Sequence, residues 1–76
     1  SEEFISYIQI EVLDKIKYAL KNNLKKVEVF NIINMAIILE IKKENFKDIL
    51  KKINENYLKV EDFENCHEIS KLINKL

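Results

Sequence analysis

The 76-residue chain contains no glycine and no proline. Tight hairpin turns of the primed types depend on glycine for their positive φ angles, so these turns lose their usual residues. Asparagine must then serve wherever the backbone needs a left-handed residue. Long strands joined by tight turns are therefore disfavoured, and the composition favours helices.

Charge of one sign is also missing, because 13 lysines balance 13 acidic residues. No basic stripe is present, which argues against nucleic acid and against a membrane surface as partners. The single cysteine excludes a disulfide within the chain, and the N-terminus shows no signal-peptide pattern. We therefore expect a cytoplasmic protein.

Arginine, threonine and tryptophan are absent, while isoleucine, lysine and asparagine supply 35 of the 76 residues. Codons for these three amino acids are AT-rich, so the bias indicates an AT-rich genome. A chain of this length makes one small domain, which we expect to span residues 1–76. Such a domain buries only about 60% of its unfolded surface, so its stability is marginal without efficient packing or a partner.

The first predicted element is a helix over residues 2–20. Its apolar residues recur at steps of three and four, and Asn22 and Asn23 supply a stop signal. A second periodic segment predicts a helix over residues 45–57, with Asn45 and Asp48 resembling a capping pair. The apolar stripe of the first helix comprises Ile5, Ile8, Val12, Ile16 and Leu20.

The run from Val29 to Ile41 (VFNIINMAIILEI) is apolar apart from two asparagines and one glutamate. Its length and its lack of glycine or proline favour a helix wrapped by the rest of the chain. The alternation in VEVF and the many β-branched residues make a buried strand the alternative. Ile33, Ile37 and Ile38 in a sheet, or standing in solvent without a companion subunit, would overturn the helix.

The C-terminal third predicts a short turn followed by a last helix. Residues 58–64 (LKVEDFE) are expected to place Leu58, Val60 and Phe63 in the core. The last helix is expected to start at Asn65, with Glu68 in the capping-box position. The sum predicts an all-α fold, a small four-helix bundle of three long helices and one short helix.

Few residues in the chain offer chemistry. Cys66 and His67 are the soft ligands, but neighbouring residues on a helix point about 100° apart and do not converge on one metal ion. We therefore expect no metal, no catalytic residue and no enzyme activity. Asn31 and Asn34 either mark the exposed edge of the central helix or form hydrogen bonds inside the bundle, and we favour the edge.

The last third of the chain resembles the C-terminal part of acyl or peptidyl carrier proteins. Residues 53–65 (INENYLKVEDFEN) and 66–73 (CHEISKLI) are similar to that family's short third helix and its fourth helix. Residues 28–40 (EVFNIINMAIILE) can be aligned with the second helix of that family. The resemblance implies an acyl-carrier-like helical bundle that works by docking to partner proteins, such as synthase or transferase enzymes.

The family carries phosphopantetheine on a serine at the start of its second helix. This chain has no serine or threonine between Ser6 and Ser70, and the two alignments place Val29 or Ile32 at the attachment position. We therefore expect no bound cofactor and no competent attachment site. By the resemblance, the partner-binding face is the start and exposed edge of the second helix, which comprises Glu28, Val29, Asn31, Asn34 and Met35.

A second hypothesis belongs to a different class. A marginal core combined with a surplus of isoleucine predicts an aliphatic strip that remains exposed and binds a second protein surface. The chain would then be a small helical regulatory or immunity-type protein that binds a single protein partner or forms a homodimer.

Overall fold

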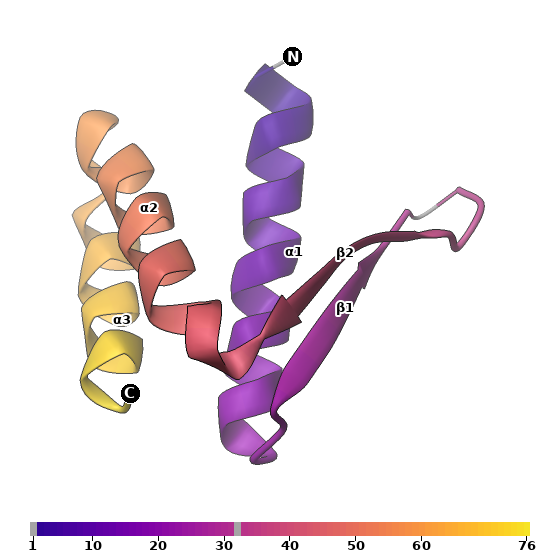
Figure 1. Cartoon of the computed structure of the whole chain (residues 1–76). Helices are drawn as coiled ribbons and strands as arrows, with labels where there is room; N and C mark the ends of the chain where they lie inside the picture. Colours follow the sequence, from indigo (N-terminus) through magenta and orange to yellow (C-terminus); the bar gives the residue numbers. More distant parts are fainter. Residues whose placement is uncertain (1, 32) are drawn as a thin grey trace. The chain divides into compact units, whose positions relative to one another are not determined.

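The computed structural model describes residues 2–31 and 33–76, with side chains from residue 7 onward (Figure 1). The predicted all-α four-helix bundle is wrong, because three helices accompany a two-stranded antiparallel sheet. The chain forms two compact units, Ser1–Glu44 and Asn45–Leu76, and its organisation as a single domain stays a prediction. The elements are α1 (Glu2–Lys21), β1 (Lys26–Phe30), β2 (Ile37–Lys42), a 3-10 turn (Lys43–Asn45), α2 (Phe46–Lys59) and α3 (Phe63–Asn74).

Helix α1 ends where the two asparagines predicted it would end. Asn23 adopts a left-handed conformation with φ 55°. The N–H of Leu24 donates to the carbonyl oxygen of Ala19 at 2.9 Å, and the N–H of Asn22 donates to that of Tyr18 at 3.0 Å. The first of these bonds is the long bond of a Schellman-type helix end, here formed around asparagine instead of glycine.

The first unit consists of α1 and the β-hairpin. Strand β1 packs against α1, and alternate residues of the strand, Val27 and Val29, are buried. On α1 the buried positions recur at helical spacing and include Val12, Ile16 and Ala19. A two-stranded hairpin is marginal alone, so burial of its apolar face beside a helix stabilises it.

The central run is the part of the chain that the helical prediction misplaced. Ile37 and Ile38 lie in β2, and the side chain of Ile33 is 94% exposed. The register pairs Val27 with Ile41 and Glu28 with Glu40, and an irregularity between Val29 and Phe30 leaves Ile38 outside the paired positions. The β-branched residues of the run favour strands, and burial alternates along β1, although Ile41 is the one buried residue of β2.

The second unit is a pair of helices, α2 and α3, that pack against each other. The predicted helix over residues 45–57 is confirmed, although Asn45 forms no side-chain cap hydrogen bond. Helix α3 starts earlier than predicted, because Asp62 rather than Asn65 is its N-cap. The buried residues are Phe46, Leu50 and Ile53 of α2 and Cys66, Ile69 and Leu72 of α3.

The turn between α2 and α3 differs from its prediction. Leu58, Val60 and Phe63 were expected in the core, yet they are 47%, 73% and 63% exposed. Glu61 holds a left-handed conformation with φ 56°, and the N–H of Asp62 donates to the carbonyl oxygen of Tyr57 at 2.9 Å. The reversal is therefore tight, and its apolar side chains point outward.

No helix in the described part of the chain has the length and apolar character needed to cross a bilayer.

Candidate functional site

The loop between β1 and β2 is built by two asparagine side chains. The side-chain oxygen of Asn31 accepts hydrogen bonds from the N–H groups of Ile33, at 2.8 Å, and Asn34, at 3.3 Å. The side-chain oxygen of Asn34 accepts one from the N–H of Ala36 at 2.9 Å. Met35 adopts φ 58°, and its N–H donates to the carbonyl oxygen of Asn31. These bonds form the turn that glycine forms in other hairpins.

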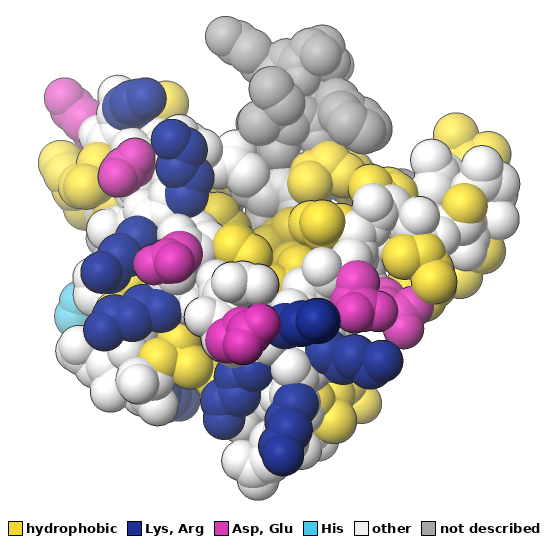
Figure 2. All heavy atoms as spheres, viewed as in Figure 1, with side chains coloured by type: hydrophobic (Ala, Val, Ile, Leu, Met, Phe, Trp, Pro, Cys, Tyr) yellow, Lys and Arg dark blue, Asp and Glu magenta, His cyan; other side chains and the backbone are white. Residues whose placement is uncertain are grey.

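The same loop and the start of β2 expose a continuous series of large apolar side chains. No charged residue occurs in residues 31–39, so charge does not interrupt the series. Figure 2 shows hydrophobic side chains gathered over the loop end of the hairpin. We call this set the hairpin surface, and its members with their exposed fractions are Ile33 (94%), Met35 (67%), Ile37 (59%), Ile38 (42%) and Leu39 (42%).

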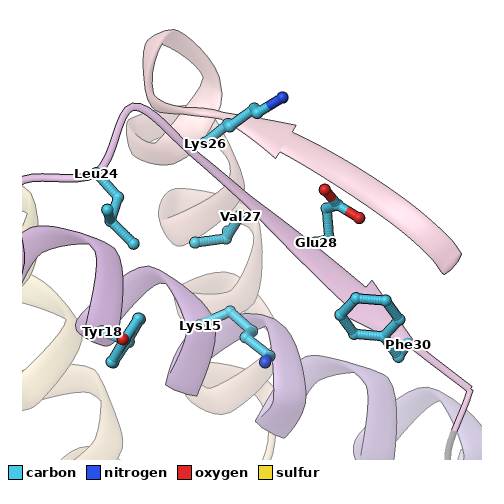
Figure 3. Close-up of a pocket in the computed structure, with 7 residues that line it drawn as sticks. All are labelled: Lys15, Tyr18, Leu24, Lys26, Val27, Glu28 and Phe30. Atoms are coloured by element: carbon cyan, nitrogen blue, oxygen red, sulfur yellow. The ribbon is translucent and has the colours of Figure 1, made fainter. Parts of the chain in front are cut away.

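A hollow of about 250 Å³ lies beside β1, between the strand and α1 (Figure 3). Lys15 and Tyr18 approach it from the helix, while Val27 and Phe30 approach it from the strand. The Lys15 ammonium lies 5.8 Å from the centre of the Phe30 ring, within the range of a cation–π contact. The walls of the hollow are therefore partly apolar, and its charged lining residues are Lys15, Lys26 and Glu28.

A second, smaller hollow of about 210 Å³ borders the loop and includes Tyr7, Glu11 and Met35. Partial burial raises the pKa of the Tyr7 phenol above its ordinary value, and the nearby Glu11 carboxylate raises this pKa further. A phenol of ordinary pKa is already neutral at physiological pH, and both causes favour this protonated form further. Tyr7 is thus a hydrogen-bonding and apolar group in this hollow.

The structure brings the predicted partner-binding residues onto one hairpin. Glu28 is half-buried and Val29 is fully buried, both in β1, so the side chain of Val29 is not offered to solvent. Asn31 and Asn34 lie in the loop, where they form hydrogen bonds with its backbone, and Met35 is exposed. Partner binding by these residues stays a prediction.

The two alignments to the carrier family gave two attachment positions. Val29 lies in a strand rather than at the start of a helix, and it carries no hydroxyl group. Ile32 lies outside the described residues. The helix on which the family's attachment site depends is a hairpin in this chain.

Cys66 and His67 point to no shared chemistry. Cys66 is buried, with its Sγ 3.8 Å from the backbone oxygen of Asn54, while His67 is exposed. Among the described residues, no group of three or more His, Cys, Asp or Glu side chains is placed to hold a metal ion. Cys66 therefore serves the packing of α3 against α2.

The sequence prediction included Met35 of the hairpin surface but missed its other members, Ile33, Ile37, Ile38 and Leu39. Ile33, Ile37 and Ile38 were assigned to a wrapped core helix, so their exposure was not anticipated. One signal was available in the sequence, because alternation over VEVF together with Asn31 and Asn34 is typical of a strand followed by an asparagine turn.

No protein-family model, curated protein or solved structure matches the chain. The resemblance to carrier proteins stays a prediction from the sequence, and the helical bundle that it implied is wrong.

Proposed function

We propose that the chain is a small protein-binding module, without chemistry of its own, that docks onto another protein through the hairpin surface. One observation carries this proposal: five large apolar side chains are exposed over residues 33–39 without an intervening charge. Exposed apolar side chains that follow one another along the chain without a charge favour a protein interaction site over ordinary surface. The proposal keeps the docking action predicted from the sequence and assigns it to a hairpin.

The loop is prepared for docking before a partner arrives. Hydrogen bonds to the side chains of Asn31 and Asn34 fix the backbone that presents Ile33 and Met35. Ordering a flexible loop upon association costs free energy, and a loop that is already ordered avoids much of that cost. The exposed side chains are thus held ready for contact.

Burial of the hairpin surface gives a moderate gain. Its five side chains expose together about as much surface as three whole side chains, whose burial is worth roughly 5–9 kcal/mol. Association costs about 4–15 kcal/mol in lost freedom, which is of similar size. A single hairpin surface therefore supports weak or moderate binding, as in regulatory contacts.

Site-specific photo-crosslinking tests the proposal. A photoreactive amino acid replaces Ile33 in the full chain, within the cells that make the protein, and the products are separated by mass. We expect one discrete product that contains a second protein. The matched control places the same probe at Val60, which is 73% exposed in the second unit. The same product from both positions, or no product from position 33, would contradict the proposal.

A further inference from the structure

The outer edge of β1 has backbone groups that point away from β2. The N–H of Lys43 donates to the carbonyl oxygen of Lys25 at 2.8 Å, so this pair belongs to the hydrogen-bonded type. Hydrogen-bonded and non-hydrogen-bonded pairs alternate along an antiparallel ladder. Because the register pairs Lys26 with Lys42 and Glu28 with Glu40, the backbone groups of Lys26 and Glu28 point to the outer edge.

The hollow beside β1 lies along this edge. Lys26 and Glu28 both line it, and so do the exposed side chains of Tyr18 and Leu24. Its volume of about 250 Å³ is below the roughly 300–1,000 Å³ of small-molecule pockets. Outward-pointing strand groups beside an open hollow with apolar and charged walls suit an added β-strand better than a compact ligand.

The charges on β1 are poorly matched inside the hairpin. Lys26 faces Lys42 across the ladder, and Glu28 faces Glu40, so each charge faces one of its own sign. Like charges directly opposite each other destabilise a strand pair. An added strand that brings an acid opposite Lys26 and a base opposite Glu28 would offset both repulsions.

Strand β1 itself carries the acid and the base that such an added strand needs, namely Glu28 and Lys26. We propose that β1 pairs with β1 of a second copy, antiparallel, about a two-fold axis at Val27. Lys26 then lies opposite the partner subunit's Glu28, and Glu28 lies opposite the partner subunit's Lys26. Val27 meets its own counterpart at the axis, and the outward backbone groups form hydrogen-bonded pairs.

The neighbouring registers bring like charges together. A two-fold axis at Lys26 places the two Lys26 side chains opposite each other, and an axis at Glu28 places the two Glu28 carboxylates opposite each other. Of the three axes centred within residues 26–28, the axis at Val27 is the one that gives two pairs of opposite charges. Charge complementarity thus selects both the occupant, a second copy, and its register.

The dimer joins two hairpins into a sheet of order β2-β1-β1-β2. It uses the outer edge of β1 and leaves the hairpin surface free on both copies. Two docking surfaces on one particle raise the avidity for a divalent target by a factor of roughly 10²–10⁴. This inference concerns a different edge from the proposed function, and the two are tested separately.

Charge reversal with complementation tests the dimer by sedimentation velocity, from about 10 μM to about 1 mM. We expect the unaltered chain to dimerise in this range. Lys26→Glu or Glu28→Lys alone should weaken the dimer at least about tenfold, because each places like charges together twice. An equimolar mixture of the two variants restores both opposite pairs and should form a heterodimer.

Both variants are expected to fold, because each also removes a like-charge pair inside the hairpin. Circular dichroism checks this point, and Glu40→Lys is the matched control because it reverses a charge on β2 without touching the β1 edge. Ile33→Asp should leave dimerisation intact, which separates this inference from docking. A monomer across the whole range, unaffected dimers in the single variants, or no heterodimer in the mixture would overturn the inference.

Discussion

The hairpin surface and the turn between α2 and α3 expose apolar side chains to a similar degree, yet they differ in setting. We call Leu58, Val60 and Phe63 the helix-turn patch. Charged residues surround each member of this patch, namely Lys59, Glu61, Asp62 and Glu64. The hairpin surface runs from residue 33 to residue 39 without a charge. Exposure alone is thus common to both regions, and continuity distinguishes the hairpin.

The two regions also use their left-handed residues differently. Met35 and Glu61 have nearly the same φ, 58° and 56°. Glu61 reverses the chain with a charged side chain that stays in water, while Met35 reverses it with an apolar side chain that is 67% exposed. The same backbone device therefore yields a solvated turn in one unit and a contact surface in the other.

The largest expected difference between the regions is in docking affinity. Ile33→Asp combined with Met35→Asn should weaken binding of the crosslinked partner about 100-fold, because both side chains are centrally exposed and charge is disfavoured in an apolar contact. Asparagine tolerates the left-handed conformation, so the loop keeps its shape. Isothermal titration calorimetry measures the affinity. Val60→Asp is the control, and an equal loss from it would refute the comparison.

Removing the hydrogen bonds that order the loop is expected to have the next largest effect. Asn31→Ala removes the acceptor for the N–H groups of Ile33 and Asn34, so we expect the hairpin to lose about 1–2 kcal/mol of stability. Amide hydrogen exchange of residues in β1 and β2 reports this loss. Asn45→Ala removes an asparagine without a side-chain cap bond and should change stability by less than about 0.5 kcal/mol. Equal effects of the two changes would show that the loop bonds contribute little.

The start of α3 gives a smaller effect in the other unit. The Asp62 carboxylate accepts hydrogen bonds from the backbone N–H of Asn65 at 3.2 Å and from its side chain at 2.7 Å. Asp62→Ala should lower the free energy of unfolding by about 1 kcal/mol, while Asp62→Asn keeps most of it. Urea titration followed by circular dichroism measures both. Docking should not change, and a change would extend the binding site to the helix-turn patch.

The smallest effect is expected at the two left-handed residues. Glycine relieves the strain of a positive φ but adds entropy to the unfolded chain, so Met35→Gly and Glu61→Gly should each raise stability by about 0.5 kcal/mol or less. Thermal unfolding checks this value. Met35→Gly should also weaken docking, whereas Glu61→Gly should not. A marked loss of stability in either variant would mean that the Met35 or Glu61 side chain stabilises the fold by more than the strain of its positive φ destabilises it.

The helical parts of the fold could be predicted because local signals agree there. The apolar spacing of α1 and α2 matches the helical period, and Asn22 and Asn23 end α1 as expected. The N-cap of α3 was misplaced by three residues, since Asp62 and Asn65 are both good capping residues and the Asp62 side chain is the one that accepts a backbone hydrogen bond, from the N–H of Asn65.

The hairpin could not be predicted from the lack of glycine and from the apolar character of residues 29–41, which were the two features used to assign a buried helix. The absence of glycine was taken to disfavour strands joined by tight turns, yet the side chains of Asn31 and Asn34 shape such a turn by accepting backbone hydrogen bonds. An apolar run was taken as buried, although in a small chain there is little surface to cover it. The residues predicted to bind a partner therefore lie on a hairpin instead of a helix, and the exposure of Ile33, Ile37 and Ile38 was not predicted.

The lone thiol of the second unit has a practical consequence. Cys66 is the single cysteine of the chain, and it is enclosed between α2 and α3 with its Sγ near the oxygen of Asn54. A bulky thiol reagent reaches it when these helices part. The rate of alkylation under native conditions therefore reports how readily the helical pair opens.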